Sequence, residues 1–102
     1  MKATLAVALG LALVQAAAFA GTEEAMTKAG CMACHTKDKK LVGPAFKEIA
    51  AKYKGQDVTA KLIEKVRKGG SGTFGPIPMA PNGPDKIDDA DLKAAVELIL
   101  KS

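Results

Sequence analysis

The 102-residue chain has no tryptophan, one tyrosine, three phenylalanines, two cysteines and a single histidine. So few aromatic side chains provide no stacking platform for nucleic-acid bases, and the net charge of +4 is not gathered into a long lysine or arginine block. Nucleic acid is therefore not an expected partner. Two cysteines and one histidine also fall short of the four ligands that a structural zinc site takes. These three residues must therefore serve another kind of site.

All three stand together in the segment 31–35, which reads Cys-Met-Ala-Cys-His. The pattern C-x-x-C-H is the attachment signature of a c-type haem. Two cysteines three positions apart lie on one side of a helical turn, so both sulfurs can form thioether bonds along one porphyrin edge. The next residue, His35, would then lie under the iron as its proximal ligand. We therefore predict one haem c, bound covalently through Cys31 and Cys34, with His35 on the iron.

Two other uses of the cysteines are weaker interpretations. A disulfide between Cys31 and Cys34 would close a very small loop and constrain little of the chain. A thioredoxin-like C-x-x-C motif needs a βαβ context, and the sequence shows no such pattern.

The first 20 residues are typical of a secretory signal peptide. Lys2 gives a positive start, residues 5–14 form an apolar run, and residues 18–20 read Ala-Phe-Ala, a small-residue cleavage site. The run is too short for a typical membrane span, although an uncleaved N-terminal anchor is the alternative. We expect a signal peptide at residues 1–20, a single monohaem domain at residues 21–102, and export to a bacterial periplasm, where thiols meet oxidants.

The remaining sequence predicts an all-α fold of about four short helices wrapped around the haem, without strands. The expected helices span approximately residues 22–29, 44–55, 57–69 and 88–100. Thr22, Asp57 and Asp88 are the expected capping residues of the first, third and last helices. Fewer than half of the residues after position 20 are apolar, a thin core for so small a domain. We therefore expect the haem to supply apolar volume and the haem-free chain to be poorly ordered.

The least regular stretch is the segment 69–84, which we call the strap. It has five glycines and four prolines, so it cannot be a helix or the interior of a sheet. A long loop in a small domain is usually functional or disordered, and we expect an ordered strap across the haem. Met79 lies within it after two prolines and is the leading candidate for the second iron ligand, because Met32 is too close to the cysteines and Met26 falls in the first helix. The alternative for Met79 is an ordinary core methionine.

Three sequence blocks resemble one family. Residues 31–35, residues 41–46 (Leu-Val-Gly-Pro-Ala-Phe) and residues 72–82 (Gly-Thr-Phe-Gly-Pro-Ile-Pro-Met-Ala-Pro-Asn) resemble the small class I c-type cytochromes, close to the bacterial cytochrome c-551 (c8) group. The resemblance covers essentially all of residues 22–102. It implies a cytochrome c fold and electron transfer through a haem.

The same resemblance implies further site residues. The carbonyl of Pro44 would accept a hydrogen bond from His35, and the amide of Asn82 would approach the methionine sulfur. Arg67 would pair with a haem propionate. Phe74 stands where the family usually has a tryptophan that donates to a propionate, which phenylalanine cannot do. For these positions the alternative is ordinary packing, capping or solvation.

Histidine and methionine together would saturate the iron, which favours electron transfer over catalysis. We expect a soluble, monomeric periplasmic carrier that is not an enzyme. The resemblance suggests nitrite reductases, terminal oxidases or a quinol-oxidising complex as partners. Two alternatives are a haem enzyme or sensor with Met79 off the iron, and a fixed subunit of a larger redox complex. Six lysines near haem-contacting segments either ring the haem edge for docking or form an ordinary solvated surface: Lys28, Lys37, Lys39, Lys40, Lys68 and Lys86.

Overall fold

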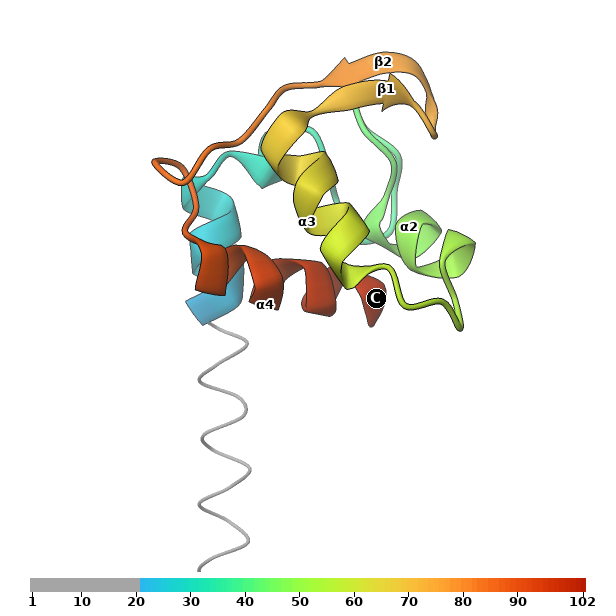
Figure 1. Cartoon of the computed structure of the whole chain (residues 1–102). Coiled ribbons are helices and arrows are strands. Elements are labelled where there is room, and N and C mark those ends of the chain that lie inside the picture. Colours follow the sequence, from blue (N-terminus) through green and yellow to red (C-terminus); the bar gives the residue numbers. More distant parts are fainter. Residues whose placement is uncertain (1–20) are drawn as a thin grey trace, which may run out of the picture.

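The computed structural model describes residues 21–102, so the predicted signal peptide lies outside the described residues. The described chain begins with a helical segment at residues 21–28. The elements that follow are the 3-10 helix η1 (Cys31–Ala33), α2 (Phe46–Lys52), α3 (Thr59–Lys68), β1 (Gly70–Gly72), β2 (Gly75–Met79) and α4 (Asp89–Leu100). Figure 1 shows α3 between the two strands at the top and α4 at the bottom. The predicted helical fold is confirmed.

The core forms where α4 packs against the other helices. Leu92 and Val96 of α4 are buried together with Met26 of the first helical segment and Phe46 of α2. Val96 is only 1% exposed. Because α4 also contacts α3, it closes one side of the fold and joins the N-terminal and central helices into one core. The last helix thus packs against the first helical segment.

The helix starts agree only in part with the sequence. Asp88 caps α4 as predicted, because its side chain accepts a hydrogen bond from the backbone N–H of Asp91 at 2.8 Å. The prediction for Asp57 is wrong: Val58 occupies the N-cap of α3 without a side-chain cap and is itself buried. Thr22 is not a cap either, since it lies inside the helical segment and is buried.

Helix α2 begins two residues later than the expected start at Pro44. The loop before α2 supplies the hydrogen-bond acceptors for the first N–H groups of the helix, which a capping side chain would otherwise provide. The N–H of Phe46 donates to the carbonyl of Thr36 at 2.9 Å, and the N–H of Lys47 donates to that of Lys37 at 3.0 Å. The first turn of α2 is therefore tied to the chain that follows the C-x-x-C-H segment.

The strap corrects the prediction of a strand-free fold. Its first part is an antiparallel hairpin in which Gly70 pairs with Met79 and Gly72 pairs with Gly75. A two-stranded ribbon has only edge strands, so its prolines interrupt no sheet interior. Four of its glycines, at positions 69, 70, 72 and 75, have positive φ, which other residues adopt at a cost. The glycines that argued against regular structure are therefore what allows the ribbon to form.

Candidate functional site: a haem cavity

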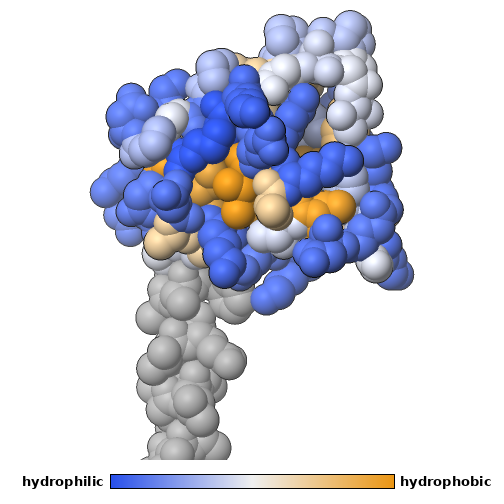
Figure 2. Space-filling model, viewed as in Figure 1, coloured by the Kyte–Doolittle hydropathy of each residue, from blue (hydrophilic) through white to orange (hydrophobic). Residues whose placement is uncertain are grey.

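A largely apolar cavity of about 470 Å³ lies between the helices and the hairpin, within the size range of small-molecule and cofactor sites. It is lined by residues from every element, including Phe46 of α2, Val66 of α3 and Val96 of α4. Figure 2 shows apolar side chains at the centre of a face whose surroundings are hydrophilic. Because Phe46 and Val96 are also core residues, whatever fills this cavity completes the hydrophobic core.

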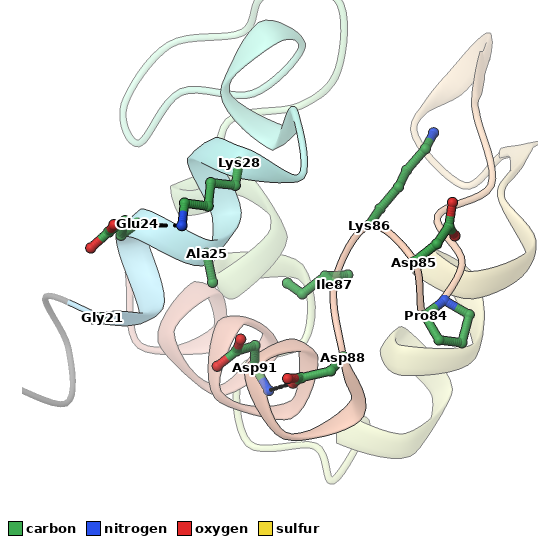
Figure 3. A pocket seen from close by; sticks show the side chains of 10 residues that line it. All are labelled: Gly21, Glu24, Ala25, Lys28, Pro84, Asp85, Lys86, Ile87, Asp88 and Asp91. Carbon is green, nitrogen blue, oxygen red and sulfur yellow. Dashed lines mark hydrogen bonds and ion pairs between the residues drawn. The ribbon is translucent and has the colours of Figure 1, made fainter.

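Four side chains that the sequence proposed as haem ligands or attachment points line this one cavity: Cys31, Cys34, His35 and Met79. A second cavity, of about 480 Å³, lies between the first helical segment and residues 84–88 (Figure 3). Its walls carry charged side chains such as Glu24, Asp85 and Asp91, and include no cysteine, histidine or methionine. The chemistry-bearing residues therefore point to the first cavity.

The imidazole of His35 is fixed on three sides. Its Nδ1 donates to the carbonyl oxygen of Pro44 at 2.7 Å, as the resemblance implied. Phe46 stacks on the ring with centroids 5.4 Å apart and planes 23° apart. Gly43 lies so close that a Cβ there would be 2.6 Å from His35 Cε1. A carbonyl only accepts, so Nδ1 carries a proton, and in this tautomer of the neutral imidazole Nε2 has its lone pair available for a metal.

The two cysteines are presented by η1. Gly30 precedes it at a φ of 86°, and the backbone N–H groups of Cys34 and His35 both donate to the carbonyl of Cys31, at 3.2 and 3.0 Å. This tight turn places both thiols at the same cavity. Both are free, with Cys31 half-buried and Cys34 exposed. Burial, reinforced by the neighbouring Cys34, raises the pKa of the Cys31 thiol, while a backbone hydrogen bond opposes the shift.

Met79 ends β2, is half-buried and lines the cavity. Met32 is 42% exposed and does not line it. Met26 does line the cavity, but it is 3% exposed and packs in the core with Phe46 and Leu92. Met79 is thus the candidate thioether that lies in the strap, whereas Met26 lies in the helical core and Met32 is exposed.

The family resemblance implied that Arg67 pairs with a haem propionate. Arg67 does not line the cavity. Its guanidinium donates to the carbonyl oxygen of Ile87 at 2.7 Å, to that of Asn82 at 3.2 Å, and to Asp89 Oδ1 at 2.7 Å. These three partners engage the guanidinium within the protein chain.

The cation of α3 that lines the cavity is Lys65, which the sequence reasoning missed. Leu62, Lys65 and Val66 are spaced i, i+3 and i+4 and all line the cavity, whereas Arg67 lies one position past this face. The helical spacing from Leu62 was the signal that could have identified Lys65.

Phe74 and Asn82 both line the cavity, as expected for site residues. Phe74 is 37% exposed, and Lys52 Nζ lies 5.7 Å from its ring centroid. The side-chain amide of Asn82 donates to the carbonyl of Ala80 at 3.0 Å, and its backbone N–H donates to that of Val66 at 2.9 Å. Asn82 therefore fixes the chain that follows Met79 within the strap itself and against α3.

Comparison with known proteins agrees with this site. The sequence model of the family described as cytochrome c matches residues 20–102. The chain belongs to the cytochrome c family. It is 51% identical over 80 residues to a cytochrome c2 of Rubrivivax gelatinosus, covering 78% of this chain and 94% of that protein. It is 44% identical over 94 residues to a cytochrome c-551 of Pseudomonas aeruginosa, covering 91% and 88% of the two chains.

Solved structures show the same fold. The crystal structure of wild-type Nitrosomonas europaea cytochrome c552 is similar with a TM-score of 0.70 and 44% identity, covering 78% of this chain and 96% of that one. The crystal structure of the class 1 cytochrome MtoD from Sideroxydans lithotrophicus gives a TM-score of 0.67 at 29% identity, with 78% and 90% covered. The protein is thus a class I c-type cytochrome of the c-551 group.

The cytochrome carries one covalently attached haem c, and the cavity fits this group. Two thiols at the attachment spacing, a histidine with a free Nε2 and apolar walls line the same space. In residues 21–102 no helix is long and apolar enough to span a bilayer. As a member of this family, the cytochrome is an electron-transfer haem protein that works with redox partners.

Proposed function

We propose that this cytochrome is a one-electron carrier whose haem iron is bound by His35 and Met79. The observation that carries the proposal is the presence of both side chains in one cavity, with His35 held so that its Nε2 is the free nitrogen. The bound haem supplies a reversible Fe(II)/Fe(III) couple. The protein chain contributes the residues that hold the haem and shield it from solvent.

His35 and its neighbours set the proximal side. The hydrogen bond from Nδ1 to the Pro44 carbonyl fixes the tautomer and increases the electron density on Nε2, which makes the imidazole a stronger donor. Stacking on Phe46 and the close approach of Gly43 prevent the ring from turning. A ligand that stays in one orientation in both oxidation states keeps the reorganisation on electron transfer small.

Met79 would be the second side chain that holds the iron in this proposal. A soft thioether favours Fe(II) and raises the reduction potential relative to a second imidazole. If His35 and Met79 both hold the iron, no site on it would be left for substrate, so we propose no enzymatic activity. The sole histidine is already used as a ligand, so no second histidine is present to act as a distal acid or base.

The haem carboxylates need cationic partners, and Lys65 is the cation of α3 that lines the cavity. We assign this role to Lys65 in place of Arg67. Lys52, beside the rings of Phe74 and Tyr53, places a second ammonium near the rim. An ammonium is a point charge and not a planar fork, so these contacts pair with a carboxylate without fixing its orientation.

Export to the periplasm completes the proposal. Residues 1–20 would be removed as a signal peptide, leaving residues 21–102 as a soluble, monomeric monohaem domain. Its partners would be respiratory redox proteins of the kinds that the family resemblance suggests: nitrite reductases, terminal oxidases or a quinol-oxidising complex.

The rim of the cavity is the proposed contact surface for these partners. Val42 and Ile77 line the cavity and are 48% and 57% exposed, and Lys40 and Lys86 lie beside the same opening. Lys28 and Lys68 instead form exposed ion pairs with glutamates on their own helices. We therefore propose as the docking surface an apolar rim flanked by Lys40 and Lys86, which suits brief encounters with an acidic partner.

We expect the bimolecular rate with an acidic redox protein to fall roughly tenfold between 0.01 and 0.1 M salt, because the Debye length shrinks from about 30 to about 10 Å. Stopped-flow measurement with the Lys40→Gln/Lys86→Gln double variant should show a much smaller salt dependence. A neutral small-molecule oxidant is the control and should react equally with both proteins. A salt-independent rate for the wild type would remove the steering role.

Spectroelectrochemical titration of the purified holoprotein tests the carrier function. We expect a single reversible one-electron wave with low-spin spectra in both oxidation states, because His35 and Met79 stay bound. The native reduced protein should not bind carbon monoxide readily. Rapid carbon monoxide binding would instead support a haem enzyme or sensor with Met79 off the iron.

A further inference from the structure

The backbone that follows Met79 rests directly on the C-terminal end of α3. The backbone N–H of Asn82 donates to the carbonyl of Val66 at 2.9 Å. Gly69, at the end of α3, lies so close to residues 79–81 that a Cβ there would collide with the Met79 carbonyl oxygen and lie 2.9 Å from the nitrogen of Pro81. The position of Met79 is thus defined relative to α3 by contacts within three residues of it.

Arg67 adds a side-chain clamp to this platform. Its guanidinium joins α3 to the carbonyls of Asn82 and Ile87, at 3.2 and 2.7 Å, and to the carboxylate of Asp89 at 2.7 Å. The Arg67 side chain is only 17% exposed, whereas that of Asp89 is 94% exposed. Hydrogen bonds from a partly buried charge to backbone carbonyls are among the stronger ones, so the two carbonyl contacts form the main part of the clamp.

The clamp holds both ends of one irregular segment, residues 82–87. Between these ends the chain has no helix or strand, and its internal hydrogen bonds are those from the N–H groups of Lys86 and Ile87 to the carbonyl of Gly83. Figure 3 shows this turn leading from Pro84 to Asp88 at the start of α4. Without the Arg67 guanidinium, the part of the strap that follows Met79 would be joined to α3 by the Asn82–Val66 backbone hydrogen bond alone.

We propose that Arg67 is a positioning residue that holds the thioether of Met79 at the haem iron by clamping Asn82 and Ile87 onto α3. The role rests on the proposed ligation of iron by Met79. A looser strap increases the fraction of molecules in which the thioether has left the iron. The apparent affinity of an external ligand for the iron rises in proportion to that fraction.

The test uses ferric and ferrous holoprotein, with imidazole and carbon monoxide as the competing ligands. Arg67→Met keeps the apolar stem and removes every donor, so we expect imidazole affinity and the rate of carbon monoxide binding to rise about tenfold. Arg67→Lys keeps the charge but loses the fork, and a smaller increase is expected. Asp89→Asn removes only the charge of the exposed partner and should stay within twofold of wild type.

Glu64→Gln is the matched control on the same helix. It breaks the exposed ion pair of Glu64 with Lys68, also 2.7 Å long, which does not contact the strap. Ligand affinities within twofold of wild type are expected. All measurements are made well below the unfolding transition of each variant, so that global stability and ligand release are separated. If Arg67→Met does not yield holoprotein, Arg67→Lys against Glu64→Gln decides the question.

The outcomes separate the two proposals. Arg67 variants that lower the unfolding midpoint but bind imidazole like the Glu64→Gln control would refute the positioning role and leave Met79 ligation intact. A wild-type protein that binds carbon monoxide as fast as a Met79→Ala variant would refute Met79 ligation, and the positioning role with it. A rise in affinity that is largest for Arg67→Met, smaller for Arg67→Lys and absent from Asp89→Asn and Glu64→Gln supports both.

Discussion

Replacing Met79 with alanine would remove the proposed second ligand of the haem iron. We expect the ferric protein to become high-spin, to lose its sulfur-to-iron absorption band and to gain at least about a hundredfold in apparent affinity for carbon monoxide once reduced, because no thioether competes. The reduction potential should fall, since the ligand that favours Fe(II) is gone. Absorption spectroscopy, carbon monoxide titration and a redox titration measure the three effects.

Met32→Ala is the control for this change, because Met32 is exposed and does not line the haem cavity. Its spectra, potential and resistance to carbon monoxide should match those of the wild type. Equal behaviour of Met79→Ala and wild type would show that the thioether of Met79 is not on the iron.

Replacing Gly43 with alanine displaces His35. The new Cβ would lie 2.6 Å from Cε1 and 3.0 Å from Nδ1 of the imidazole, so the ring must shift from the position in which it donates to the Pro44 carbonyl. Overpacking of this kind costs about 1–3 kcal/mol, and loss of the Nδ1 hydrogen bond adds about 1 kcal/mol. We expect a lower unfolding temperature together with a changed potential, because the proximal imidazole becomes a weaker donor.

Gly55→Ala distinguishes this effect from a general cost of replacing glycine. Gly55 has a φ of 78° and no atom within 4 Å of the position its Cβ would take, so alanine there introduces backbone strain without touching the haem site. Both variants should unfold at lower temperature, but only Gly43→Ala should alter the haem spectrum and potential. An unchanged potential in Gly43→Ala would contradict the role assigned to the Gly43 contact.

The sequence predicts the parts of the candidate site whose residues are close together in the chain. The spacing of Cys31, Cys34 and His35 specifies the haem attachment within one turn, and the fold needs only to present it. Met79 was predicted as a ligand from its position in the strap and by exclusion of the other methionines, and in the structure it lines the same cavity as the cysteines and His35. Apolar periodicity likewise identified the helices, because each must bury one face.

The errors arose where tertiary contacts decide between neighbouring residues. Arg67 and Lys65 are both basic and two positions apart, and the face that α3 turns to the cavity presents Lys65, which is why the propionate contact is now proposed there. Asp57 has the better capping side chain, but burial of Val58 sets the start of α3. The hairpin was missed because glycine and proline argue against strands in general, while at positive φ glycine is what a tight two-stranded ribbon requires.

The central claim is that a histidine nitrogen and a thioether bind the iron together. The absorption spectrum of the ferric holoprotein at neutral pH tests it most directly. We predict a low-spin spectrum with the weak sulfur-to-iron band at the red end of the visible range. A high-spin ferric spectrum without that band would contradict the assignment of Met79 as a ligand.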